Sequence, residues 1–351
     1  MNQTEIRKDE HIRISLENDV SSDYNYWDDI KIIHNALPEL NKDEIDYKHK
    51  IFKKEIGAPL IIAGMTGGYN KAEKINENLA IAAEKFQIGM GVGSQRAAIE
   101  KKDLKKTYSV IKNYDIPLRI ANIGVSQIVE WGKDKTLDFA KEMIEMIDAH
   151  VFAICLNFLQ EVIQAEGETN AKGAIEIISH LSSELDVPVI VKESGAGISY
   201  ELAERLSKTN IAGIDVGGLG GTSFSAIEHY RAKKIKDELH ARGGKTFWNW
   251  GIPTPTSVVE VSDATEGKIE IIATGGIRNG LDAAKAIIIG ADAAGIAKTI
   301  LKPATEGKKE TIAELEAIIK EIRAVMFLTG SKNTSELKNA NWTVIGDRLW
   351  M

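Results

Sequence analysis

The sequence has only one cysteine, Cys155, among its 351 residues. A single thiol excludes an intrachain disulfide and any metal site built from several thiolates. The chain also lacks an uninterrupted apolar run long enough to cross a bilayer. Its first residues, MNQTEIRKDEHIR, lack the apolar centre of a secretory signal. We therefore expect a cytoplasmic protein that has no membrane partner.

An excess of positive charge is missing as well. The formal net charge is −7 at pH 7, whereas affinity for nucleic acid comes mostly from clustered positive charge. We therefore expect no nucleic-acid partner, and any basic residues that bind phosphate must be local. With 43% hydrophobic and 27% charged residues the composition is typical of a globular protein. The length allows one large α/β barrel or two average domains.

From residue 59 onward the sequence repeats one pattern, which is an apolar strand, a small or polar loop and an amphipathic helix. The expected strands are Leu60–Ala63, Ile88–Gly91, Leu118–Asn122, Val151–Leu156, Val189–Lys192, Gly213–Val216, Ile269–Thr274 and Asp292–Ile296. The expected helices are Lys71–Phe86, Lys102–Tyr114, Thr136–Ile147, Ala171–Glu184, Ser199–Thr209, Thr256–Asp263, Leu281–Ile289 and Thr311–Leu328. Eight such units predict the α/β class and a (β/α)8 TIM barrel. A doubly wound open sheet is the alternative, but MTGGYN stands after the first strand where its GxGxxG fingerprint belongs.

Two segments fall outside this repeat. Residues 1–57 are polar and irregular, and we expect an arm or lid with a short helix near Tyr26 to His34, followed by the barrel over residues 58–351. After the sixth strand, residues 217–253 contain a glycine-rich loop, a helix over Ser225–Arg242 and the aromatic segment TFWNWGIPT. Excess length at the face that carries the strand C-termini predicts an inserted lid.

The stretch Ala273 to Lys298, ATGGIRNGLDAAKAIIIGADAAGIAK, predicts a phosphate site. Gly275 and Gly276 follow the seventh strand directly, and glycines there let the backbone approach a ligand with its N–H groups exposed. A helix that opens after Asn279-Gly280 adds a favourable dipole for an anion, and barrels commonly bind phosphate after strands seven and eight. The alternative is a tight βαβ turn that needs glycine for geometry only.

Polar residues follow every expected strand, in the position where barrel enzymes build their active sites. They are Met65-Thr66-Gly67-Gly68, Gly93-Ser94-Gln95-Arg96, Asn122-Ile123-Gly124, Asn157 to Glu161, Lys192-Glu193-Ser194, Gly217 to Thr222, Gly275 to Arg278 and Ala297-Lys298. Each one alone is equally consistent with a turn or a helix cap. Their joint placement indicates a site at one end of the barrel.

Three of these side chains suggest specific chemistry. Lys192 at the barrel mouth could form a Schiff base or stabilise negative charge on a bound ring, or it could pair with Glu193. Glu161 beside amide side chains suits Mg²⁺, which keeps several waters and shares a ligand phosphate, although a solvated helix-cap charge fits equally. Arg96 is a candidate for a bidentate phosphate contact.

Two further groups carry a weaker signal. Arg7, Lys8 and His11 form a small cationic cluster in the arm, which on its own is more typical of surface charge. Cys155, next to the end of the fourth strand, is more typical of a small buried side chain than of a nucleophile.

A set of motifs in this sequence resembles type 2 isopentenyl diphosphate isomerase, and the resemblance covers nearly the whole chain, including the RKDEHI arm. The motifs are MTGG (65–68), GVGSQRAA (91–98), ANIG (121–124), LNFLQE (156–161), VKESGAGIS (191–199), IDVGGLGGTSF (214–224), WGIPT (250–254), ATGGIRNGLDAAKA (273–286) and MFLTG (326–330). The TGGIR motif alone is shared by many flavin barrels.

The resemblance implies an FMN-dependent barrel that interconverts isopentenyl and dimethylallyl diphosphate with reduced FMN and Mg²⁺, after reduction of the flavin by NAD(P)H. By the family pattern the flavin would contact Met65, Thr66, Gly67, Ser94, Asn122, Lys192 and Thr222, and its phosphate would lie at Gly275, Gly276, Arg278, Ile296 and Ala297. The substrate would contact Arg7, Lys8, Ser94, Gln95, Arg96, Asn157 and Gln160, with Glu161 on Mg²⁺. A homo-oligomer, a tetramer or an octamer, is implied as well.

Moving a double bond requires one proton to be delivered and another removed, and the sequence offers no evident carboxylate pair at the strand ends; the reduced flavin can take that role. We expect Lys192 to steady the anionic reduced ring and Gln160 to orient the substrate, with Glu228 as a secondary acid–base candidate. The chain departs from the family at Cys155, where a histidine is usual, and this puts one diphosphate contact in doubt. It also has AEGE at 165–168 in place of PEGD.

Three other functions are compatible with parts of the pattern. An FMN-dependent 2-hydroxy acid oxidase shares the barrel and the TGGIR loop, but it needs a histidine base where Asp215-Val216-Gly217-Gly218 stands here. An aldolase could use Lys192 as a Schiff base. A protein that only stores flavin is disfavoured, because Arg96, Gln160 and Glu161 occur together.

Overall fold

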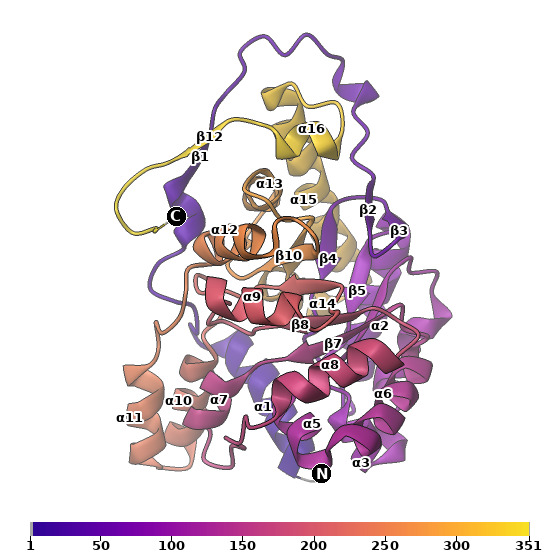
Figure 1. Cartoon of the computed structure of the whole chain (residues 1–351), viewed down its shortest axis with the longest axis vertical. Helices are drawn as coiled ribbons and strands as arrows, with labels where there is room; N and C mark the ends of the chain where they lie inside the picture. The colour runs from indigo at the N-terminus through magenta and orange to yellow at the C-terminus, as the bar shows by residue number, and fades with distance from the viewer. Residues whose placement is uncertain (1–2, 351) are drawn as a thin grey trace.

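The computed structural model describes residues 3–350, and eight parallel strands close into a barrel at its centre (Figure 1). The strands are β4 (Leu60–Ile62), β5 (Gly89–Gly91), β6 (Arg119–Gly124), β7 (Val151–Cys155), β8 (Val189–Lys192), β9 (Gly213–Asp215), β10 (Glu270–Thr274) and β11 (Ala293–Ile296). Each pairs in parallel with its neighbour in sequence, and β11 pairs with β4 to close the ring. The predicted (β/α)8 barrel is confirmed.

Helices surround the barrel. They are α2 (Ala72–Phe86), α3 (Arg96–Glu100), α4 (Lys106–Ser109), α5 (Val125–Trp131), α6 (Lys133–Ile147), α7 (Phe158–Ile163), α8 (Ala174–Glu184), α9 (Tyr200–Ser207), α12 (Thr254–Thr265), α13 (Gly280–Ile288), α14 (Lys298–Glu306), α15 (Lys308–Thr329) and α16 (Thr334–Lys338). The helix expected over residues 102–114 is broken into the 3-10 turns η3 (Lys102–Leu104) and η4 (Val110–Asn113) on either side of α4. The segment that was expected to form one helix therefore forms three short helical pieces.

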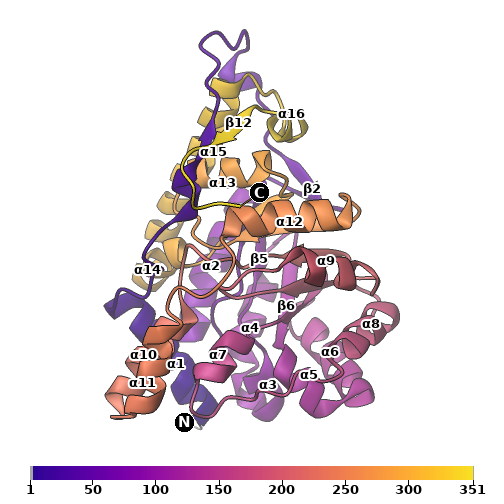
Figure 2. The ribbon, with the colours of Figure 1, turned by 60° about the vertical axis from the view of Figure 1, so that its left-hand side comes forward.

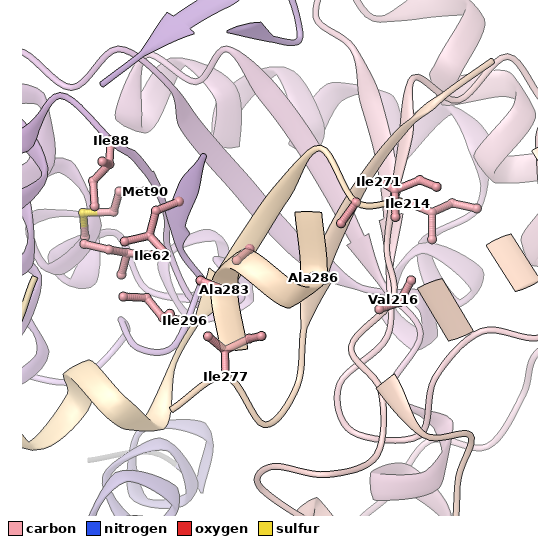
Figure 3. Packing of buried hydrophobic residues seen from close by; sticks show 14 of the residues in the cluster. Ile62, Ile88, Met90, Ile214, Val216, Ile271, Ile277, Ala283, Ala286 and Ile296 are labelled. Carbon is pink, nitrogen blue, oxygen red and sulfur yellow. The ribbon is translucent and has the colours of Figure 1, made fainter. Parts of the chain in front are cut away.

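The strands bury both faces, as their Val, Ile and Ala content predicts for a parallel sheet. Between the barrel and its outer helices, Ile62 and Ile296 of the strands pack near Ala283 and Ala286 of α13 (Figure 3). Inside the barrel a second apolar cluster contains residues from the N-terminal halves of the strands. The hairpin of β2 (His49–Ile51) and β3 (Lys54–Ile56) adds Ile51 and Phe52 to this cluster and closes that end of the barrel.

The N-terminal arm differs from the expectation. It begins with a 15-residue helix, α1 (Gln3–Glu17), where an irregular segment was predicted. The helix predicted near Tyr26 to His34 is instead the 3-10 turn η1 (Tyr26–Asp29) followed by strand β1 (Ile30–Ile32). β1 pairs antiparallel with β12 (Trp342–Val344), so this strand depends on a partner from the far end of the chain. A further 3-10 turn, η2 (Lys42–Glu44), follows.

The segment after the sixth barrel strand contains two helices, α10 (Phe224–Lys234) and α11 (Glu238–Thr246), where one was predicted. Lys236 lies between them with φ at +61°, a left-handed conformation that ends the first helix. The Asp237 side chain then accepts a hydrogen bond from the His240 N–H and caps α11. α10 and α11 lie beside α1 at the barrel mouth (Figure 2), where Ile14 and Val20 pack on Ala226 and Ile227.

Candidate active site at the barrel mouth

The C-terminal ends of the barrel strands open into one cavity of about 550 Å³, a size typical of a pocket for a cofactor or a small ligand. Residues at or just past the C-terminal end of every barrel strand line it, and residues of α1 and of the arm segment 21–25 add to the lining. The predicted residues that line it are Arg7, Lys8, Met65, Thr66, Gly67, Ser94, Arg96, Asn122, Asn157, Gln160, Glu161, Lys192, Thr222, Gly275, Gly276, Arg278 and Ala297. Polar groups from distant parts of the sequence are thus collected in one place.

The loop after β10 has the geometry of an anion site. Gly275 and Gly276 have φ of +124° and +72°, a region that side chains rarely adopt. Their carbonyls face the arm, where Trp27 Nε1 donates to the Gly275 oxygen at 2.9 Å and Asn25 Nδ2 donates to the Gly276 oxygen at 2.7 Å. The N–H groups of Gly276 and Ile277 have no hydrogen-bond partner among residues 3–350. They are therefore free for an anionic ligand.

The helix that points at the cavity is α14, and the dipole expected from α13 is not available there. In α13 the first N–H groups are taken, because Gly280 donates to Glu321 and Asp282 donates to the Asn279 side chain. At α14, by contrast, Ala297, Lys298 and Thr299 line the cavity. The N-terminus of α14 is the one that can favour an anion.

Arg278 lines the cavity, but its guanidinium is already paired. It donates to Asp282 at 2.7 Å and to Asp28 at 2.6 Å, and both carboxylates raise its pKa. A fully compensated guanidinium is a weaker partner for phosphate than a free one. A further positive charge comes from Lys298, which lines the cavity, donates to Ser21 Oγ at 2.8 Å and lies 3.8 Å from Asp19.

Three cations meet where α1 and α3 reach the cavity. Lys8 donates to the carbonyl oxygen of Ser94 at 2.8 Å, and its pKa is lowered to about 7, first by burial and then by the charges of Arg7 and Arg96, although Glu100 opposes the shift. Arg96 is held by Glu100 at 2.6 Å and Glu168 at 3.1 Å. The positive charges of Arg7 and Arg96 disfavour the protonated form of Lys8, and a bound anion would offset this effect.

The short helix α7 places Gln160 and Glu161 at the cavity with Asn157 just before them. Both oxygens of the Glu161 carboxylate accept hydrogen bonds, one from Asn157 Nδ2 at 2.8 Å and one from the Glu168 N–H at 2.9 Å. Asn157 Oδ1 is buried without a hydrogen-bond partner. Among residues 3–350 no group of three or more His, Cys, Asp or Glu side chains is arranged around a metal position.

Glu228 lies behind Gln160 and does not line the cavity. Its carboxylate accepts from Gln160 Nε2 at 3.3 Å, from Arg231 at 2.6 Å, and contacts His11 Nε2 at 2.9 Å. Burial alone would raise the pKa of Glu228, but His11 and Arg231 lower it. A carboxylate in this position can orient the Gln160 amide.

Lys192, at the end of β8, is surrounded by other titratable groups. It donates to the Glu193 carbonyl at 2.9 Å and lies 3.8 Å from Asp215 of the neighbouring strand. Burial would lower the pKa of Lys192, but Cys155, Asp215 and Glu193 raise it. Burial raises the pKa of the Cys155 thiol, so this side chain is not an activated nucleophile. The ammonium charge on Lys192 argues against the Schiff-base alternative, which needs a neutral amine.

Two further predicted contacts do not face the cavity. Gln95 is fully buried, and its side chain donates to the Met143 carbonyl and accepts from the Asn122 N–H, which fixes β6 against α6. Ile296 is buried in the strand layer, and its carbonyl accepts from the Ala63 N–H. Both residues belong to sequence motifs that resemble the family, but their side chains are buried in the protein and do not line the cavity.

Several lining residues were not among the sequence-based candidates for binding. Asn25, Ser21 and Ser22 belong to the polar arm segment, and Lys298 follows the eighth strand. The segment NDVSSDYN has no apolar period and no motif, so nothing in it predicted a place at the cavity. Lys298 was expected at this end of the barrel because it follows the eighth strand, but the sequence assigned no ligand to it.

Comparison with known proteins defines the class first. Residues 157–344 match the protein family described as FMN-dependent dehydrogenase, so the chain belongs to this class of α/β barrel. The structure resembles mandelate oxidase solved with (S)-2-phenylpropionate (TM-score 0.66, 15% identity, 97% of each chain). It also resembles mandelate oxidase solved with 3,3-difluoro-2-hydroxy-3-phenylpropionic acid (TM-score 0.64, 16% identity, 97% of this chain and 98% of that one). At this identity the likeness shows the fold alone.

Sequence relatives then define the family. The chain is 47% identical to an isopentenyl-diphosphate delta-isomerase of Thermoplasma acidophilum over 98% of both chains. It is 46% identical to that of Thermoplasma volcanium over 99% of both chains, and 42% identical to that of Methanosarcina mazei over 99% of this chain and 93% of the relative. The chain therefore belongs to the isopentenyl-diphosphate delta-isomerase family, which confirms the resemblance seen in the motifs.

Proposed function

We propose that this protein interconverts isopentenyl and dimethylallyl diphosphate by a 1,3-allylic proton shift, using reduced FMN and Mg²⁺. The observation that carries the proposal is the division of the cavity between two anion sites. The free amides of Gly276 and Ile277 come from the loop after β10, and Arg7, Lys8 and Arg96 come from α1 and α3. Two separate phosphate-bearing ligands, a flavin nucleotide and an alkenyl diphosphate, account for both.

The residues present fit FMN. The flavin phosphate would bind the amides of the Gly275–Ile277 loop, the N-terminus of α14 and the charge of Lys298. Thr66 Oγ1, in the loop after β4, is buried without a partner, and it could bind a polar edge of the ring. When bound, the reduced cofactor supplies a proton donor and acceptor that the chain itself does not offer.

The diphosphate would bind between the arm and α3, where its charge restores the ammonium form of Lys8. Mg²⁺ would bind Glu161 and share the diphosphate, since this ion takes oxygen ligands and keeps several waters. The unpartnered Asn157 Oδ1 fits the same role, because it is a buried oxygen with a free lone pair. A single carboxylate is enough when the substrate itself supplies anionic oxygens.

The remaining side chains would orient and protect the alkene. Gln160 of α7 lines the cavity. Its Nε2 donates a hydrogen bond to the Glu228 carboxylate, so its Oε1 is the atom that would contact the substrate. Lys192 provides a fixed positive charge for an anionic ring. Phe224, Ile12 and Met65 line the same space and exclude water from a carbon chain that develops positive character. We propose that Glu228 acts through Gln160 as a positioning residue.

An FMN-dependent 2-hydroxy acid oxidase is the second candidate, since the fold is shared with mandelate oxidase. Such an enzyme needs a base after the sixth barrel strand, and here that segment is Asp215-Val216-Gly217-Gly218, with Asp215 buried beside Lys192. A single carboxylate would also balance less of the positive charge of Arg7, Lys8 and Arg96 than a diphosphate does. The isomerase proposal explains both features.

The experiment begins with the purified protein and its flavin absorption band. Conversion of isopentenyl diphosphate should require reduction of the flavin, by dithionite or by NAD(P)H, without net consumption of reductant. A colourless preparation that still converts the alkene, or turnover of lactate or glycolate in its place, would overturn the proposal. Glu161→Gln should raise the Mg²⁺ concentration needed for half-maximal rate, whereas Glu130→Gln on the exposed side of α5 should not.

Two further parts of the proposal rest on the family alone. NAD(P)H is the proposed reductant, and a homo-oligomer, either a tetramer or an octamer, is the proposed assembly in the cytoplasm. Among residues 3–350 no helix is long and apolar enough to span a bilayer. Light scattering of the loaded enzyme tests the assembly, and comparison of NADH with NADPH in anaerobic reduction tests the reductant.

A further inference from the structure

A second, much smaller cavity lies inside the barrel on the inner side of the main one. Its volume is about 20 Å³, and it shares Asn122, Lys192 and Thr274 with the lining of the main cavity. Below it lie Ile61 and Ile190 of the apolar cluster that fills the other half of the barrel. A space of about 15 Å³ or more can hold one water molecule if polar partners surround it.

Three atoms that line this space are buried and lack a hydrogen-bond partner among residues 3–350. They are Asn122 Oδ1, Asp215 Oδ1 and Thr274 Oγ1. Buried polar atoms in folded proteins are nearly always bonded to protein or to ordered water. The Thr274 side chain lies close enough to Asp215 to lower the pKa of its carboxyl group. Because the three atoms come from β6, β9 and β10 and line one small cavity, a single partner shared by this pair and Asn122 is indicated.

The fourth polar group is the Lys192 ammonium. Its nitrogen donates to the Glu193 carbonyl at 2.9 Å, which leaves two further hydrogens. The nearest carboxylate oxygen, Asp215 Oδ2, is 3.8 Å away, too far for a direct hydrogen bond. A polar contact across such a distance commonly contains a bridging water.

The count of donors and acceptors identifies the occupant. Asn122 Nδ2 donates to the Val92 carbonyl at 3.2 Å, so the side of the amide that faces the cavity is its oxygen, a pure acceptor. Asp215 Oδ1 also accepts, Lys192 only donates, and the Thr274 hydroxyl does either. A water molecule has two hydrogens and two lone pairs, which satisfies all four groups at once. A metal cation would instead meet the ammonium charge at close range.

We infer that one internal water occupies this space, and that Asp215 acts through this water as a positioning residue that holds Lys192 beneath the bound cofactor. The water itself rests only on the geometry of the chain. The consequence for Lys192 rests on the proposed function, because it assumes that the ammonium faces the flavin. Asp215 is adjacent to Lys192 in the strand register, so the pair is held by two barrel strands and not by a loop.

The first test is a high-resolution crystal structure of the FMN-loaded protein. We expect a density peak about 2.6–3.2 Å from Asp215 Oδ1, Asn122 Oδ1 and Lys192 Nζ. An empty space would overturn the inference. So would a direct contact of Lys192 with Asp215, an atom of the cofactor at this place, or a peak with several oxygen ligands near about 2.4 Å, which is typical of a cation.

A matched pair of variants tests the water by stability. Thr274→Val removes one of its four partners, whereas Thr256→Val in α12 removes a hydroxyl that is equally buried and unpartnered but lies outside the cavity. We expect the Tm of the first variant to fall by about 2 °C or more and that of the second to stay unchanged. Equal changes in the two variants would contradict a water at Thr274.

The positioning role is tested by Asp215→Asn, which keeps the shape of the side chain and removes its charge. We expect kcat to fall by about tenfold or more while KM for the alkenyl diphosphate stays within about twofold, because the substrate contacts lie elsewhere. An unchanged kcat in an active enzyme would overturn the role of Asp215. If the wild-type protein proves not to be an isomerase, the crystallographic and stability tests still decide the water.

Discussion

The Lys8 ammonium makes the binding of an anionic substrate depend on pH in a way that can be calculated. Its pKa in the unliganded protein is about 7, because burial and the charges of Arg7 and Arg96 disfavour the protonated form. With this pKa, the protonated fraction falls from about 0.9 at pH 6 to about 0.1 at pH 8. Since kcat/KM reports groups of the free enzyme, we expect Lys8 to reduce kcat/KM by up to about tenfold over this interval as the pH rises.

The assay is the pH profile of kcat/KM for isopentenyl diphosphate in wild type and in Lys8→Arg. Arginine stays charged throughout, so the variant should lose this step while any titration of the substrate remains in both profiles. Lys8→Met, measured at pH 6, should lose about 10- to 100-fold in kcat/KM, as expected for one charge-assisted hydrogen bond.

Other charged groups set the controls. Glu100 contributes a charge that raises the pKa of Lys8 and opposes the effect of Arg7 and Arg96. Glu193 titrates in the same range, because burial raises its pKa to about 7. The pH profile of kcat/KM for Glu193→Gln should therefore still show the decrease that the titration of Lys8 causes. Identical profiles for wild type and Lys8→Arg would refute the reasoning, because the step would then belong to the substrate or to another side chain.

Three further predictions follow from the same contacts. Gln160→Ala should lower kcat by about 10²-fold or more with a smaller change in KM, and full activity in the variant would remove Gln160 from the mechanism. Cys155→His should lower KM more than it raises kcat, and an unchanged KM would show that this position is not a substrate contact. The folded-state pKa of Glu193 lies above the unfolded value of 4.5, so its contribution to stability is present below about pH 4.5 and is lost as the pH rises through about 7. Relative to Glu193→Gln, the wild type should thus lose up to about 3 kcal/mol across this range, measured as unfolding free energy by urea titration.

The barrel could be predicted because its strands are encoded locally. Most of them are short apolar runs rich in Val, Ile and Ala that end at glycine or a polar residue, and the expected bounds of β4 to β11 differ from the observed ones by at most two residues. The arm could not be predicted in this way. In α1 the sequence QTEIRKDEHIRISLE shows little apolar periodicity, and the helix is stabilised by contacts of Ile14 with α10. β1 likewise exists through its pairing with β12, more than 300 residues away.

The sequence predicted the location of the site better than it predicted the contacts of the individual side chains. A glycine pair after a strand indicates where a phosphate can lie, because backbone geometry is local. The partners of a charged side chain are not local. Arg278 stands in a phosphate-loop motif, yet Asp28 of the arm takes up its guanidinium from 250 positions away. Gln95 likewise lies in a motif, yet its side chain is buried and donates a hydrogen bond to the Met143 carbonyl.

The arm links the two anion sites of the cavity. Trp27 and Asn25 bind the carbonyls of the Gly275-Gly276 loop, while Lys8 in α1 binds the carbonyl of Ser94. Docking of the arm therefore fixes the loop whose amides would receive one anion in the proposed function, and it completes the cation cluster that would receive the other. A ligand that stabilises the docked arm from either side reduces the cost of ordering it for the other. Because such coupling is reciprocal, we expect phosphate-bearing ligands at the two sites to bind with positive cooperativity, even though no side chain has to contact both.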